Sequence, residues 1–132
     1  MKQSNIPLIP VSWGEFIDKL SILEIKKEKI DNVDALANIN RELSYLLNIL
    51  DQHDYLPIVL ELKETLKSIN LKLWEIEDAV RKKTFDKEFD QEFIDLAVSV
   101  VVFNTQRHTT KRLIDVTLNS EISEEKQYSA YE

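Results

Sequence analysis

Apolar residues recur along most of the chain at steps of three and four, a spacing typical of amphipathic helices. The pattern predicts four helices. The first lies between a Ser12 cap and the Asp31–Asn32 break, and the other three span about 34–52, about 57–83 and about 88–118. Prolines keep residues 1–11 extended, and residues 119–132 form an acidic tail. We therefore expect one all-α domain over residues 1–132, an antiparallel bundle of four helices, two of them longer, with extended termini.

The first helix opens with a capping box, in which the Ser12 oxygen accepts from a backbone amide of the first turn and the Glu15 carboxylate reaches back. Trp13 and Trp74 lie at helical spacing, and we expect both to anchor the core. His53 lies in the turn sequence DQHD, where a lone histidine is expected to be solvated.

The segment LAVSVVVF, residues 96–103, is rich in β-branched residues and in isolation could form a buried strand. Its context favours a helix, because the apolar residues on either side keep a helical period and no second strand is available for pairing. Since the segment is apolar almost all round, we expect it to form the middle of the central, most buried helix.

The two longer helices cannot be covered by the two shorter ones. The remaining apolar surface is expected to be covered by the prolyl lead and by the tail, where Tyr128 and Tyr131 can dock, and also by a second copy of the chain. The sequence therefore predicts a homodimer.

The composition excludes several classes of function. A net charge of −7 argues against binding to nucleic acid or to an anionic membrane, and the absence of cysteine excludes disulfides and thiolate sites. The start, MKQSNIPLIP, has no long apolar run, so we expect neither a signal peptide nor a membrane span, and a cytoplasmic location. With a single glycine and no recognisable nucleophile arrangement, no nucleotide-binding loop and no catalytic residue can be assigned.

Acidic residues recur in the pattern E-x-x-D, which places two carboxylates on one helical face, where they can bind a divalent cation together. The four matches are Glu15/Asp18, Glu28/Asp31, Glu75/Asp78 and Glu92/Asp95. Solvated faces and first helical turns also favour acids. The candidate metal ligands are Glu75 and Asp78, which lie with Glu77 beside Trp74. Apart from magnesium at this pair, we expect no cofactor.

A polar face interrupts the apolar stripe of the fourth helix, and it consists of Asn104, Arg107, His108 and Lys111. Two interpretations remain open, because burying an unpaired charge is costly. In the first, the basic groups, with Arg112, pair internally with acids such as Glu24, Glu42, Glu77 or Asp78. In the second, they line a pocket for an anionic ligand, which Asn104 orients.

Four segments of the chain are distinctive: IPVSWGEFIDKLSILEIKKEKI (9–30), LWEIED (73–78), NTQRHTTKR (104–112) and EEKQYSAY (124–131). Together they resemble a family of small bacterial proteins of unknown function, whose genes are sometimes associated with surface-polysaccharide synthesis. The resemblance implies no catalytic role for any residue. It points to Glu15, Asp18, Lys19, Glu24, Trp74, Glu77, Asp78, Asn104, Arg107, Lys111 and Arg112.

The sequence thus defines an architecture and a set of candidate residues, but not an activity. Our leading hypothesis is a non-catalytic binding or accessory protein, in which a polar cluster recognises a small anionic ligand or a partner protein. The cluster is expected where the first helix, the end of the third and the middle of the fourth converge. The alternatives are a magnesium-dependent phosphoryl or pyrophosphate hydrolase and a structural oligomerisation module.

Overall fold

The protein is all-α, as the hydrophobic pattern predicts. A computed structural model describes residues 5–54 and 56–127. Its four helices are α1 (Trp13–Lys29), α2 (Val33–Asp51), α3 (Pro57–Phe85) and α4 (Gln91–Thr117). These bounds agree with the predicted ones to within about three residues, because caps and prolines mark most of the helix ends.

Three of the helices begin at a side chain that accepts a hydrogen bond from a backbone amide in the first turn. These capping residues are Ser12, Asn32 and Asp90. Helix α3 instead begins with Pro57, whose missing N–H would have no partner at that position. Polar caps and proline therefore mark where each helix starts.

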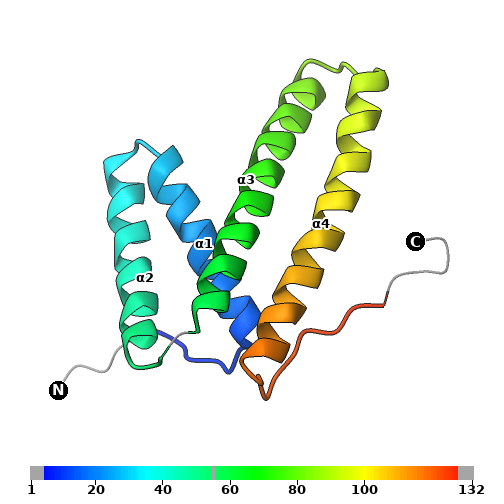
Figure 1. The fold of residues 1–132 in the computed structure, drawn as a ribbon. Coiled ribbons are helices and arrows are strands. Elements are labelled where there is room, and N and C mark those ends of the chain that lie inside the picture. Colours follow the sequence, from blue (N-terminus) through cyan, green and yellow to red (C-terminus); the bar gives the residue numbers. More distant parts are fainter. Residues whose placement is uncertain (1–4, 55, 128–132) are drawn as a thin grey trace.

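Helix α1 lies at the centre of the bundle and contacts each of the other three helices, while α3 and α4 form a long hairpin (Figure 1). The core lies where the side chains of the four helices meet. Its buried members are Phe16, Ile17, Leu20, Leu23, Ile39, Leu43, Leu46, Val59, Leu62, Leu66 and Ile114. Trp13 packs against this core, as predicted, and its ring lies 5.4 Å from that of Phe16 and 4.9 Å from that of the exposed His53.

The prediction that the valine-rich segment is the most buried part of the bundle is wrong. The segment is helical, but Val98, Val101 and Val102 are 58%, 56% and 47% exposed. The reason is geometric: these valines lie on the face of α4 opposite Arg107 and Lys111, which bind α1, and the α3–α4 hairpin also continues beyond the ends of α1 and α2 (Figure 1). Burial in α4 is concentrated instead in its second half, between His108 and Asp115.

The termini do not cover this apolar surface within the described residues. In the lead, Leu8 and Ile9 are 89% and 75% exposed, and residues 122–127 run as an irregular segment from the end of α4. Tyr128 and Tyr131, which are expected to dock, lie outside the described residues. Among the described helices, none has the length and apolar character required to cross a membrane.

Candidate functional site

The first turn of α1 lies directly against α4. Gly14 is buried there, and a Cβ atom at this position would overlap the backbone carbonyl of Lys111. The Gly14 amide donates to the Asp115 carboxylate at 2.6 Å, and the Trp13 amide donates to Ser120 Oγ at 3.1 Å. Because the start of a helix carries free N–H groups and a partial positive charge, the Asp115 carboxylate stabilises it. The only glycine of the chain thus allows two helices to approach closely.

The predicted capping box forms only in part. The Glu15 amide donates to Ser12 Oγ at 3.0 Å, as expected. The Glu15 carboxylate, however, accepts a hydrogen bond from Lys111 Nζ at 2.7 Å. A buried ammonium group competes successfully for this carboxylate, since a charged hydrogen bond is stronger than one to a backbone amide.

Asp18, one turn further along α1, is the centre of a buried polar network. It is 1% exposed and accepts from Arg107 through two parallel bonds, at 3.1 Å from Nε and 2.5 Å from Nη2. Asn70 of α3 donates to Asp18 at 2.8 Å and to Ser21 at 2.9 Å. The hydrogen bonds that Arg107 donates to Asp18 raise the pKa of Arg107 above its ordinary value. The bidentate pair fixes the plane of the guanidinium group.

Lys111 is the second cation of the network and is 7% exposed. Its ammonium group lies 2.7 Å from Glu15, 2.6 Å from Glu124 of the C-terminal segment, and 4.0 Å from Asp18. Burial opposes the charged form of Lys111, but the hydrogen bonds that it donates to Glu124 and Glu15 outweigh this effect, so its pKa is raised. The same Lys111 bond lowers the pKa of Glu124. The pair therefore fastens the C-terminal segment to α4.

A cleft opens beside this network, between α1, α3 and α4. Its volume is about 230 Å³, and its lining residues are Ile22, Ile25, Asn70, Leu73, Trp74, Glu77 and Arg107. Arg107 belongs both to the network and to the cleft wall, with 30% of its side chain exposed. The lining of the cleft therefore combines apolar and aromatic side chains with hydrogen-bonding groups.

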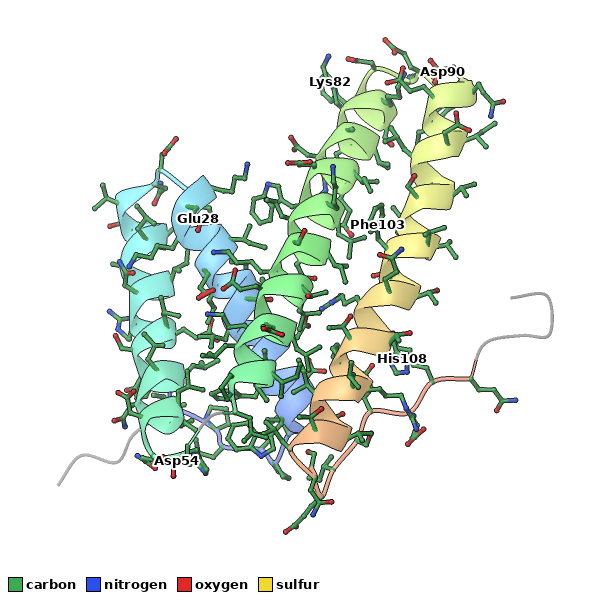
Figure 2. All side chains as sticks on the ribbon, in the orientation of Figure 1. Glu28, Asp54, Lys82, Asp90, Phe103 and His108 are labelled. Carbon is green, nitrogen blue, oxygen red and sulfur yellow. The ribbon has the colours of Figure 1, made fainter. Side chains whose placement is uncertain are left out.

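A much smaller crevice lies near the other side of Arg107. It is lined by Asn104, Arg107, His108, Lys111 and Lys126, and its volume of about 20 Å³ leaves space for one water molecule. His108, labelled in Figure 2, marks the level on α4 at which the C-terminal segment passes. The volume is too small for an organic ligand.

The sequence also matches a family model, for a family of unknown function (DUF6165), over residues 8–131. The chain belongs to this family. The comparisons find no match among curated proteins or among solved structures. The family model assigns no activity to this DUF6165 protein.

The basic groups of the DUF6165 chain pair internally, but with acids other than those expected. Arg112 binds Glu125 at 2.8 Å, and Glu24 binds Lys63 at 2.8 Å. Glu42 binds Lys19 at 2.9 Å. The turn of α4 that carries Arg107 and Lys111 lies beside the first turns of α1. These two cations therefore pair with Asp18 and Glu15, which lie in those turns. Among the expected acids, Glu77 comes closest to the prediction, since it shares the cleft with Arg107.

The convergence of α1, α3 and α4 brings together most of the predicted site residues. Glu15, Asp18, Asn104, Arg107, His108 and Lys111 lie in or beside the network, and Trp74 and Glu77 line the cleft. Trp74 is half-buried in a cleft wall, and the core cluster that Trp13 contacts does not include it.

Glu75 and Asp78, the candidate metal ligands, are exposed on α3. In the part of the chain that the structure describes, no group of three or more histidine and acidic side chains is arranged to hold a metal ion.

Sequence reasoning missed four residues of the site: Gly14, Asn70, Asp115 and Glu124. Two of them carried a detectable signal. Gly14 is the only glycine of the chain and lies inside a helix, which indicates close packing. Asn70 lies on the apolar stripe of α3, four residues after Leu66 and three before Leu73, where a polar residue needs a partner.

Proposed function

We propose that the protein is a non-catalytic binding protein, and that the cleft between α1, α3 and α4 holds a small carboxylate ligand. The observation that carries this proposal is the position of Arg107, which is held in place from behind by Asp18 and lines the cleft in front. A guanidinium group has five N–H donors, and the Asp18 bonds use two of them. The remaining donors are available to a ligand oxygen.

Charge decides which anion fits. Asp18 neutralises Arg107, and Glu77 adds a negative charge to the same cleft. A multiply charged phosphate would therefore meet no net positive charge there. A single carboxylate is more favourable, provided that the ligand also carries an ammonium or hydroxyl group that can donate to Glu77.

The volume of the cleft and the chemistry of its lining residues narrow the class of ligand further. The cleft of about 230 Å³ lies below the roughly 300–1,000 Å³ of most drug-sized ligand sites. Leu73 and Trp74 offer an apolar and aromatic surface to the body of the ligand. We infer a ligand of the size of an amino acid or a hydroxy acid, with an apolar or flat body.

Two features support a role in binding rather than in hydrolysis. The acids of α1 that a magnesium site would need, Glu15 and Asp18, already bind Lys111 and Arg107. Glu75 and Asp78 lie exposed on α3. No specific observation favours the hydrolase alternative.

A thermal-shift screen tests the proposal. The probes are apolar and aromatic L-amino acids and small hydroxy acids, with inorganic phosphate and nucleoside monophosphates for comparison. At a hundredfold excess over Kd, a ligand stabilises by about 2.7 kcal/mol. At about 4 °C per kcal/mol for a domain of this size, we expect a rise in Tm of roughly 10 °C.

Two cleft variants and a matched control complete the test. Glu77→Gln and Trp74→Ala should each reduce the shift, because the first removes the negative charge that attracts a donor group of the ligand and the second removes the aromatic surface of the cleft. Glu75→Gln is the control, since Glu75 is exposed on the same helix and does not line the cleft. If no carboxylate probe raises Tm, or if the cleft variants respond like the control, the proposal is wrong.

A further inference from the structure

Helix α4 carries a long apolar stripe on its outer face. Its exposed members are Ile94, Val98, Val101, Val102, Leu113 and Val116, each between 47% and 74% exposed. At about 100° per residue these positions fall within roughly a third of the helix circumference. From residue 94 to residue 116 the stripe is about 33 Å long. Helix α4 contacts α3 and α1, and Figure 1 shows it at the edge of the helical arrangement.

The middle of the stripe carries polar side chains whose hydrogen bonds are satisfied within α4. Thr105 and Thr109 lie there, and their hydroxyls donate to the carbonyls of Val101 and Thr105, both at 3.0 Å. Because these hydroxyls already have acceptors in α4 itself, they need no partner from outside. Threonine side chains are also short, which lets another helix approach closely.

We propose that a second copy of the chain covers this stripe, with the two α4 helices packed antiparallel and the two-fold axis at Thr105. Thr105 is the midpoint between Ile94 and Val116, so this arrangement covers the whole stripe of both copies. It sets Ile94 against Val116 and Val101 against Thr109. The inference does not depend on the ligand proposed for the cleft.

Charge favours a second copy at this face. The chain carries a net charge of −7, so two copies repel each other over most of their surfaces. On and beside the stripe the charged residues of α4 are Asp95 and Arg112, and Arg112 also pairs with Glu125 of the C-terminal segment at 2.8 Å. Antiparallel packing brings Asp95 of one copy to within about one turn of Arg112 of the other, whereas parallel packing would place like charges together.

The exposed area is also sufficient. The six apolar side chains expose roughly 500 Å² in total, at the upper end of the largest patches on monomeric proteins. Two copies would bury up to roughly 1,000 Å² before flanking polar groups are counted, which is the lower limit for a biological interface.

The first test is the mass of the full chain in solution, measured by light scattering at tens of micromolar. We expect twice the 15.5 kDa of one chain. Val101→Glu should give a folded monomer, because glutamate is tolerated in an exposed helix but not at a dry interface. Val33→Glu is the control, since Val33 is 78% exposed on α2, away from the stripe, and the variant should stay dimeric. A monomeric parent chain, or a dimeric Val101→Glu variant, would overturn the proposal.

The second test uses the absence of cysteine in the chain. Thr105→Cys should form a disulfide between copies under mild oxidation, because the two residues meet at the axis. Val98→Cys should not, because two copies of residue 98 would lie about 21 Å apart along the helices, far beyond disulfide reach. Cross-linking of Val98→Cys, or none of Thr105→Cys, would contradict the antiparallel arrangement.

Discussion

We predict that removing either member of the buried pair Asp18–Arg107 lowers the stability of the fold, but by different amounts. Asp18 is 1% exposed, whereas 30% of the Arg107 side chain is exposed to the cleft. Removing the arginine leaves a deeply buried carboxylate without its main partner. Removing the carboxylate leaves a guanidinium group that water in the cleft can still solvate. We therefore expect Arg107→Met to cost more than Asp18→Asn.

The magnitudes follow from the contacts. Breaking a buried ion pair from one side costs about 3–5 kcal/mol, and the low end applies here because Lys111 lies 4.0 Å from Asp18 and Asn70 still donates to it. Arg107→Met should therefore lower the free energy of unfolding by about 3 kcal/mol. Asp18→Asn should cost about 1–2 kcal/mol, because it keeps the shape of the side chain and loses one charge. The double variant should be more stable than the sum of the two costs implies, by at least about 1 kcal/mol.

Urea unfolding followed by far-UV circular dichroism measures these differences at pH 7. All variants are compared at one protein concentration, since association would add to apparent stability. An Arg107→Met variant as stable as the parent chain would refute this reasoning. It would also show that Asp18 does not hold Arg107 at the cleft wall, and the small-ligand proposal would lose its anchor.

Three further predictions concern packing and the C-terminal segment. Gly14→Ala should lower the free energy of unfolding by about 2–3 kcal/mol in urea unfolding, because the added Cβ meets the Lys111 backbone, which cannot move cheaply; a change below about 0.5 kcal/mol would contradict the close packing. Leu66→Ala should cost about 2–5 kcal/mol in the same assay, since Leu66 is 0% exposed. The Glu124 carboxylate, whose pKa is lowered from about 4.5, stabilises the fold above that pH and stops doing so as pH falls through its lowered pKa. Glu124→Gln should therefore lower the free energy of unfolding by less than about 1 kcal/mol at pH 7, and this difference from the parent chain should vanish in acid. A constant difference from pH 7 to pH 3 would exclude this role of Glu124.

The sequence was sufficient to predict the helices because their signals are local. Ser12 caps α1, Pro57 opens α3, and the apolar period identifies each helix from residues near one another in the chain. The same argument predicted that the basic residues of α4 turn inward, since Arg107 and Lys111 interrupt an apolar stripe. Such features depend on spacing alone.

The burial of individual side chains and the partners of the ion pairs could not be predicted in this way, because both depend on how the helices are arranged against one another. Val98 is as apolar as any core residue, but it lies on the face of α4 opposite Arg107 and Lys111, which bind α1, so Val98 remains exposed. Lys111 could have paired with acids anywhere on α1 or α3. The close contact at Gly14 fixes the level, and it brings Glu15 to Lys111. One small residue thus decides which ion pairs form.

The two parts of α4 can be separated by experiment. The network residues Arg107 and Lys111 face α1, whereas Val101 lies on the outer stripe. If the cleft binds a ligand and the stripe binds a second copy, Val101→Glu should abolish dimerisation and leave the ligand-induced rise in Tm within about 2 °C of the parent value. Glu77→Gln should do the reverse, because Glu77 lines the cleft and is not part of the stripe. Loss of both properties in either variant would mean that the cleft and the α4 interface are coupled, and that each copy needs the other to hold Arg107 in place.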